Sequence, residues 1–144
     1  MILDVKDLRI GNIVCDDTTF KTFNFIESII FKNGEYAVSL RNKHYATWLE
    51  HNGEPMIFGI PLTEEWLIKL GFEDTKDYHY RDKTIKDYAV KEWFNSEFSY
   101  IFTIKKGNVE FGSMEYPNTE PKPPKYVHEL QNLYFSFTGK ELIL

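Results

Sequence analysis

Residue types that could support catalysis are few in this chain. Nucleophilic catalysis would need Cys15, the single cysteine, or a serine beside a base. Asp16 and Asp17 follow Cys15 directly, and their negative charge raises the pKa of a thiol. We therefore expect Cys15 to have a structural role. Because the sequence also lacks a Gly-x-Ser-x-Gly motif, a glycine-rich phosphate loop and a His-Glu-x-x-His motif, it predicts no catalytic residue.

The possible metal ligands are scattered. His44 and His51 lie on either side of one expected strand, too far apart in the sequence to indicate a shared ion. Asp77 and His79 would point to the same face of a strand, with Asp82 nearby. Two ligands on one face fall short of the three or four side chains that a zinc site requires. We therefore predict neither a metal site nor a cofactor.

One face of the helix expected at residues 126–138 departs from a plain core pattern. Phe135 points away from the apolar stripe of this helix, and His128, Gln131 and Asn132 surround it. An aromatic side chain among amides and a histidine on an outward face is typical of a contact surface. We therefore predict that these four residues bind a partner. The alternative is that the helix is covered on both sides and that Phe135 is buried. The stripe consists of Tyr126, Val127, Leu130, Leu133, Tyr134 and Phe137.

A short helix expected at residues 63–71 connects the two halves of the chain. Thr63 can cap its N-terminus with a side-chain hydroxyl. Gly71 can end it in the left-handed conformation, after which Phe72 folds back on Leu67, as in a Schellman motif. A helix of about two turns is marginal by itself. We therefore expect packing to hold it as a connector between two β-rich regions.

Residues 1–62 are predicted to form a small β-barrel. Asn33-Gly34 between two β-rich runs is the strongest short signal for a hairpin. Five short strands joined by tight turns indicate a partly closed, five-stranded barrel, and their spacing fits an SH3-like and an OB-like barrel equally. The β-rich runs are residues 8–14, 22–31, 36–41, 45–50 and 56–60.

Residues 63–144 are predicted to form an antiparallel sheet with one helix packed on it. The expected strands lie within residues 73–91, at 98–104 and at 109–116, and the last residues, 141–144, form a short edge strand. A proline-rich connector precedes the C-terminal helix. The predicted fold class is therefore α+β, with a barrel lobe at 1–62 and an α+β lobe at 63–144 in one compact unit.

The charge balance limits the choice of partners. Lys and Arg number 17 against 22 Asp and Glu, which gives a net charge of −5. Non-specific binding to nucleic-acid phosphates needs a basic surface, so this balance argues against it. A single cysteine excludes an internal disulfide and fits a reducing compartment. Because no stretch reaches the length of a membrane span, we expect a cytoplasmic protein.

Three motifs carry a resemblance: residues 8–14, residues 60–67 with 70–72, and residues 126–135 with 138–139. In this order and spacing they resemble a group of short uncharacterised proteins from gut Bacteroidetes and from their phages and mobile elements. The group has no established activity. The resemblance therefore implies a bacterial or phage cytoplasmic setting and transfers no catalytic residue.

Three functional hypotheses follow. The leading one is a non-catalytic binding module, an accessory protein of a phage or mobile element that contacts a protein partner. The second is a nucleic-acid-binding protein that uses the barrel face, because exposed aromatic rings can stack on bases. Lys83, Lys86 and Lys91 lie among aromatic residues, but neighbouring acids such as Asp82 and Asp87 cancel their charge. The third is an enzyme of unfamiliar type, and the oligomeric state stays open.

Overall fold

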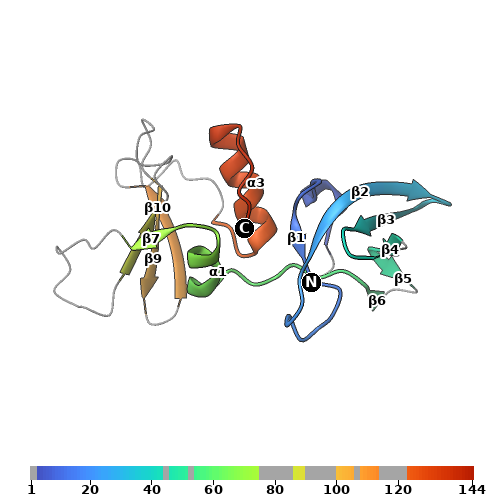
Figure 1. Cartoon of the computed structure of the whole chain (residues 1–144), viewed down its shortest axis with the longest axis horizontal. Coiled ribbons are helices and arrows are strands. Elements are labelled where there is room, and N and C mark those ends of the chain that lie inside the picture. Colours follow the sequence, from blue (N-terminus) through green and yellow to red (C-terminus); the bar gives the residue numbers. More distant parts are fainter. Residues whose placement is uncertain are drawn as a thin grey trace.

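Two antiparallel sheets flank a pair of helices in this protein. The computed structural model describes residues 3–43, 46–51, 54–74, 86–89, 100–105, 108–113 and 123–144. Within these ranges, one four-stranded sheet has the order β1-β2-β3-β4, a second has the order β10-β9-β8-β7, and β5 and β6 form a small two-stranded sheet. Helices α1 and α3 lie between the two four-stranded sheets (Figure 1), so the fold is α+β. The elements are η1 (Val5–Asp7), β1 (Ile13–Val14), β2 (Asn24–Lys32), β3 (Glu35–Leu40), β4 (Ala46–Trp48), β5 (Glu50–His51), β6 (Glu54–Pro55), α1 (Glu64–Lys69), β7 (Glu73–Asp74), β8 (Lys86–Ala89), β9 (Tyr100–Lys105), β10 (Asn108–Ser113) and α3 (Val127–Thr138).

The first sheet is a curled half-barrel of four strands, with β2 as its longest strand (Figure 1). The predicted hairpin at Asn33-Gly34 is confirmed. Both residues have positive φ, 56° and 85°, which is the backbone of a type I′ turn and which asparagine and glycine tolerate best. The turn places Phe31 directly opposite Tyr36. A bulge between Ile26 and Ser28 lies in β2, and bulges increase the local bend of a strand.

The strand expected at residues 56–60 is wrong in its extent. The structure has β6 at Glu54–Pro55, followed by an isolated bridge in which Phe58 and Cys15 exchange hydrogen bonds of 2.7 and 2.9 Å. Ile57 is buried in one core cluster and Ile60 in the other. This segment therefore crosses between two cores instead of following one partner strand.

Helix α1 confirms the predicted caps. Thr63 Oγ1 accepts a hydrogen bond from the backbone nitrogen of Trp66 at 3.4 Å. Gly71 has φ of 83°, and the backbone nitrogen of Phe72 donates to the carbonyl of Leu67 at 3.0 Å. This is the 6→1 bond of a Schellman motif. Trp66 and Leu67 are buried, so packing holds the helix as expected.

Helix α3 begins one residue later than predicted and ends where predicted. The Glu129 carboxylate accepts from the backbone nitrogens of Lys125 and Tyr126 at 2.6 and 3.2 Å, which satisfies donors at the N-terminus. Gly139 has φ of 67° and donates to the carbonyl of Phe135 at 2.8 Å. Local sequence thus specifies both ends of this helix.

The two cores share strand β1. Successive side chains of a strand point to opposite faces. Ile13 and Cys15 accordingly join the cluster around α1 and α3, whereas Val14 joins the cluster under the β1–β4 sheet. Val109 of β10 packs against the first cluster. Strand β1 therefore separates the two cores and contributes side chains to both. The predicted boundary between a lobe at 1–62 and a lobe at 63–144 stays a prediction.

Several predictions fall outside the described residues. They concern the candidate metal ligands His44, Asp77, His79 and Asp82, the lysines Lys83 and Lys91, and most of the expected strands within 73–91. The edge strand expected at 141–144 is wrong. These residues have no strand partner; instead the carbonyl of Leu142 accepts from Gln131 Nε2 at 3.0 Å.

Candidate functional site

Gln131 joins helix α3 to the edge of β1. Its Oε1 accepts a hydrogen bond from the backbone nitrogen of Ile13 at 2.8 Å. Its Nε2 donates to the carbonyls of Leu142 at 3.0 Å and of Gly11 at 3.3 Å. The residue is 1% exposed. A buried amide with both ends bonded is stabilising, whereas one left unpaired is costly.

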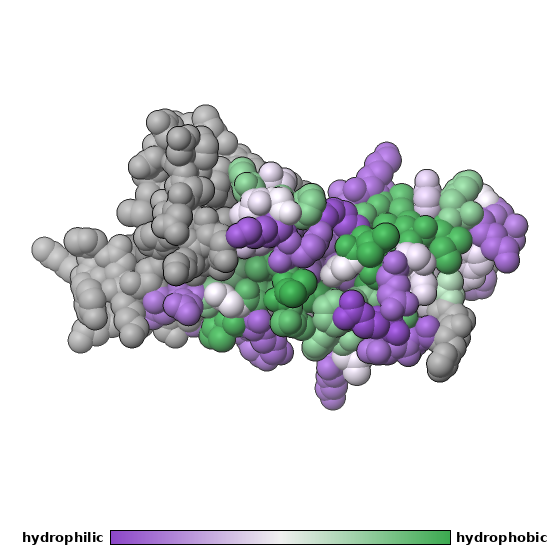
Figure 2. All heavy atoms as spheres, turned by 45° about the horizontal axis from the view of Figure 1, so that its top comes forward, coloured by the Kyte–Doolittle hydropathy of each residue, from purple (hydrophilic) through white to green (hydrophobic). Residues whose placement is uncertain are grey.

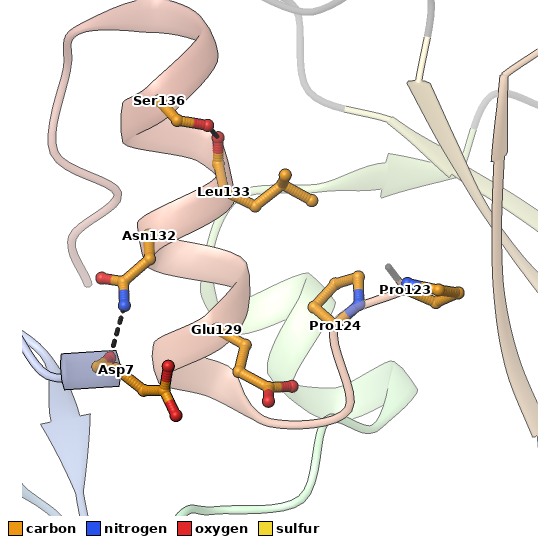
Figure 3. A pocket seen from close by; sticks show the side chains of 7 residues that line it. All are labelled: Asp7, Pro123, Pro124, Glu129, Asn132, Leu133 and Ser136. Atoms are coloured by element: carbon orange, nitrogen blue, oxygen red, sulfur yellow. Dashed lines mark hydrogen bonds between the residues drawn. The ribbon is translucent and has the colours of Figure 1, made fainter. Parts of the chain in front are cut away.

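Two asparagines extend this network to η1. Asn12 is buried, and its Nδ2 donates to Asn132 Oδ1 at 3.0 Å. Asn132 Nδ2 in turn donates to the carbonyl of Asp7 at 2.6 Å, the bond drawn in Figure 3. Asn12 Oδ1 accepts from the backbone nitrogen of Arg9 at 2.7 Å. The amides of α3 thus position the backbone of residues 7–13.

His128 is packed as a neutral ring. It is 1% exposed and stacks on Tyr126, with 5.8 Å between ring centres and 21° between planes. Its Nδ1 is buried and makes no hydrogen bond within the described ranges. Burial lowers the pKa of His128, although the nearby carboxylates of Glu129 and Asp7 oppose the shift. A Cβ added at Gly59 would lie 2.9 Å from His128 Cε1, so glycine is required there for space.

The expectation that this face of α3 points outward is wrong for His128 and Gln131. This face is covered at the level of Gln131 and Asn132, because their amides bond to the backbone of Ile13 and Asp7. Phe135 is neither free nor fully buried. It is 36% exposed, and the guanidinium carbon of Arg9 lies 3.7 Å from its ring centre. The helical periodicity placed these residues on one face correctly, but periodicity carries no information on which distant segment covers that face. Partner binding by His128, Gln131, Asn132 and Phe135 stays a prediction.

A groove opens beside Phe135 and is lined by residues from three parts of the chain. Its volume is about 570 Å³. The lining residues come from the loop before β1, from the residue that follows β3 and from the segment after α3: Arg9, Ile10, Gly11, Arg41, Glu141 and Ile143. We call it the Arg9–Arg41 groove. Ile10 is 63% exposed and Ile143 is 68% exposed, so apolar surface lies next to two guanidinium groups.

The two arginines of this groove differ in their electrostatic surroundings. Arg9 Nη2 lies 2.7 Å from Glu141 Oε1, and its Nη1 is buried without a hydrogen bond in the described part of the chain. The guanidinium carbon of Arg41 lies 4.6 Å from the centre of the Phe25 ring. No described acidic side chain forms an ion pair with Arg41. One positive charge of the groove is therefore balanced within the chain and the other is not.

A second hollow lies between η1 and the first turns of α3 (Figure 3). Its volume is about 330 Å³. Glu129 lines it but already caps the helix, and Asn132 is bonded to the backbone of Asp7. Ser136 Oγ donates to the carbonyl of Leu133 at 2.7 Å. Most of its polar groups thus have partners within the chain, which makes it the weaker candidate.

Sequence reasoning missed the Arg9–Arg41 groove. Arg9 lies inside the first of the three motifs, but Arg41 carries no local signal. The groove depends on long-range pairing. Gly11 donates to the carbonyl of Ile26 at 2.7 Å, and Arg41 donates to the carbonyl of Phe25 at 3.0 Å. Both arginines are therefore placed by β2, which single-sequence patterns do not show.

Cys15 belongs to the core around α1 and α3, which supports its predicted structural role. It is buried, and its single S–H is shared between the carbonyls of Asp17 and Thr22, which lie 3.1 and 2.8 Å from Sγ. Burial is the largest cause that raises the pKa of this thiol, and the charges of Asp17 and Asp16 act in the same direction. A thiol in this setting is a poor nucleophile.

Other chemistry is sparse in the part of the chain that the structure describes. No group of three or more His, Cys, Asp or Glu residues there could hold a metal ion. Among those same residues, no helix combines the length and the apolar character needed to cross a membrane. Comparison of the chain with family models, with curated proteins and with solved structures finds no match. The geometry of the groove is therefore the main guide to function.

Proposed function

We propose that this chain is a non-catalytic binding module that contacts a protein partner at the Arg9–Arg41 groove, as an accessory protein of a phage or mobile element. The observation that carries the proposal is the pairing of exposed Ile10 and Ile143 with the guanidinium of Arg41, which has no described acidic partner. Arginine is among the residues that most often contribute binding energy at protein interfaces, and exposed apolar side chains beside it add surface that a partner can bury.

The surroundings of the groove support a preorganised surface. Gln131 and Asn12 fix the backbone of the loop that carries Arg9 and Ile10. The Phe135 ring packs against the guanidinium of Arg9 and restrains that side chain. A surface whose groups are already held in place loses less conformational entropy when a partner binds.

Affinity capture of the tagged full chain from a bacterial lysate, read by quantitative mass spectrometry, tests this proposal. A partner that survives nuclease treatment should be lost with Ile10→Ser and with Arg41→Gln. Lys32→Gln is the matched control, because it removes the same charge at the exposed far end of β2. Equal recovery of every protein by wild type and both groove variants would contradict the proposal.

We also propose that the four-stranded half-barrel is the main part of a small barrel of SH3-like or OB-like kind, and that Phe58 closes it at the edge of β1. The bridge between Phe58 and Cys15 supports this, since it lies on the free edge of β1. Amide hydrogen exchange tests it. The amide of Phe58, bonded to Cys15, should exchange as slowly as the central amides of β2 and β3, and rapid exchange at Phe58 would count against closure.

Nucleic-acid binding by the barrel face is the second candidate function. One observation favours it: Phe31 is 64% exposed and its ring centre lies 4.8 Å from that of Tyr36. Figure 2 shows hydrophobic residues gathered over the part of the molecule that carries the β1–β4 sheet. A mobility-shift assay at low salt should then show binding that Phe31→Ala weakens, and no shift with single-stranded or duplex DNA or RNA would end this alternative.

A further inference from the structure

The chemistry of the Arg9–Arg41 groove defines its ligand more closely than the proposed function, on which this inference rests. We propose that the groove binds an acidic side chain flanked by apolar residues in a segment of a protein partner. The carboxylate pairs with Arg41, and the apolar neighbours pack on Ile10 and Ile143.

Arg41 is prepared to receive a carboxylate. Its guanidinium carbon lies 4.6 Å from the centre of the Phe25 ring. A ring contact of this kind restrains the flexible side chain but leaves its N–H donors available, because they lie at the edge of the planar group. Within the ranges that the structure describes, no carboxylate uses those donors. A fixed guanidinium with free donors matches a carboxylate in two-point geometry.

The other end of the groove shows which chemistry this surface accepts. Glu141 Oε1 lies 2.7 Å from Arg9 Nη2, and Ile143, two residues further along, contributes to the apolar lining. Leu142 between them is buried and anchored by Gln131. The segment after α3 thus already presents an acid and an apolar side chain to the groove. Because Glu141 neutralises Arg9, the incoming carboxylate is directed to Arg41.

Charge and lining favour a protein segment over a nucleic acid. A nucleic-acid strand brings a row of phosphates and needs a row of cations, whereas one arginine of this groove is unmatched. The Glu141 carboxylate in the same groove and the net charge of −5 both oppose a polyanion. Isoleucine side chains offer no ring on which bases could stack. They do offer a surface for apolar side chains of a peptide.

Selection of random short peptides displayed on phage against the immobilised full chain tests the inference. We expect enrichment of peptides in which Asp or Glu lies beside Leu, Ile, Val or Phe. The affinity of a selected, fluorescently labelled peptide, measured by anisotropy, should fall about tenfold or more with Arg41→Gln. Lys32→Gln should leave it unchanged, and Ile10→Ser should weaken it whether or not the peptide is acidic. Circular dichroism confirms that each variant is folded.

The other outcomes separate the two proposals. Selected peptides that bind with Ile10-dependent affinity but without acidic residues would overturn the carboxylate inference and leave the proposed function standing. Selection of no peptide that depends on Ile10 would overturn the inference and count against the groove as a protein-binding site. A single-stranded oligonucleotide that displaces the labelled peptide, and whose binding requires Arg41, would assign the groove to phosphate and overturn both.

Discussion

Gln131 Oε1 lies 2.8 Å from the backbone nitrogen of Ile13, so a side chain of α3 occupies a hydrogen-bonding position at the edge of β1. Cys15 exchanges backbone hydrogen bonds with Phe58 on the same edge. An exposed strand edge invites pairing with other chains. Here a helix side chain and one bridge residue cover the edge, and the same contacts place the backbone that carries Arg9.

Loss of the Gln131 amide should therefore destabilise the fold strongly. Gln131→Leu keeps a similar side-chain volume but leaves the buried nitrogen of Ile13 and the carbonyl of Leu142 without this partner. We expect the free energy of unfolding to fall by about 2–4 kcal/mol in urea denaturation. Ser136→Ala on the exposed face of α3 is the control and should change it by less than about 0.5 kcal/mol. A loss below about 1 kcal/mol for Gln131→Leu would show that the network is dispensable.

Gly59→Ala should displace the stacked rings of Tyr126 and His128. The added methyl group would lie 2.9 Å from His128 Cε1 and 3.0 Å from Tyr126 Cδ1. Overpacking of this kind costs about 1–3 kcal/mol of stability. In a double-mutant cycle with His128→Ala, the double variant should lose less stability than the sum of the single variants, because the clash is partly removed. Additive losses would contradict a direct contact.

His128 should make stability depend on pH in a defined window. Burial lowers its pKa in the folded protein below the ordinary value of 6.5, so the unfolded chain binds more protons as the pH falls. The stability that the neutral His128 ring contributes is therefore fully present above about pH 6.5, and it declines as the pH falls below that value. Urea unfolding between pH 7.5 and about 5 should show this loss, and His128→Gln should flatten the slope. His51→Gln, at an exposed site, is the control; an unchanged slope in the His128 variant would argue against a buried neutral ring.

Asp17 titrates at a lower pH than His128, so it does not interfere with the pH dependence expected from His128. Its carboxylate accepts hydrogen bonds from the backbone and hydroxyl of Thr19 and from the hydroxyl of Thr22. These bonds hold the pKa of Asp17 well below its usual range. The unfolded chain therefore binds a proton at Asp17 only near the ordinary pKa of 3.8 and below. Stability linked to this carboxyl is lost below that value, under the range assigned to His128.

Local signals predicted the parts of the fold that neighbouring residues decide. Thr63 with Gly71, the Asn33-Gly34 turn and Gly139 each mark a boundary through their own backbone or side-chain preferences. The 3-10 helix η1 and the short length of β1 were not predicted. Gly11, with φ of 89°, turns the chain immediately before β1, and the adjoining loop is held by Asn12 and by residues of α3, far away in the sequence.

The candidate site was harder to predict for the same reason. His128, Gln131 and Asn132 were correctly grouped on one helix face, yet that face is a contact within the chain. Amides suit both a solvent-exposed contact surface and a buried network that bonds to a backbone, and residue type does not distinguish them. The groove between Arg9 and Arg41 requires the pairing of β1, β2 and β3, which only the structure shows.

Cys15 should react slowly with thiol reagents in the folded protein. Its Sγ is buried and bonded to two carbonyls, and its pKa is raised. Reaction therefore requires opening of the structure around it. We expect alkylation by iodoacetamide at pH 8 to be at least about a hundredfold slower in native buffer than in guanidinium chloride. Similar rates in the two conditions would show that the loop after β1 opens readily.

Removal of the Glu141 charge should strengthen the binding of acidic peptides to the groove. The carboxylate of Glu141 lies in the same groove as Arg41 and repels an incoming carboxylate. Glu141→Gln should lower the Kd of such a peptide by up to about fivefold, the range that exposed charge pairs contribute. Glu35→Gln, at the start of β3, is the control of equal charge and should have no effect. Weaker binding by Glu141→Gln would place the peptide elsewhere.

The bond between Ile13 and Gln131 also has a consequence during synthesis of the chain. The two residues are 118 positions apart, and translation at about 5–20 residues per second separates their appearance by about 6–24 s. Throughout this interval the nascent β1 strand lacks the Gln131 side chain that occupies its edge. The core cluster that contains Ile13 also lacks the apolar side chains that α3 contributes. A chaperone that masks strand edges would act in that interval, before the last helix leaves the ribosome.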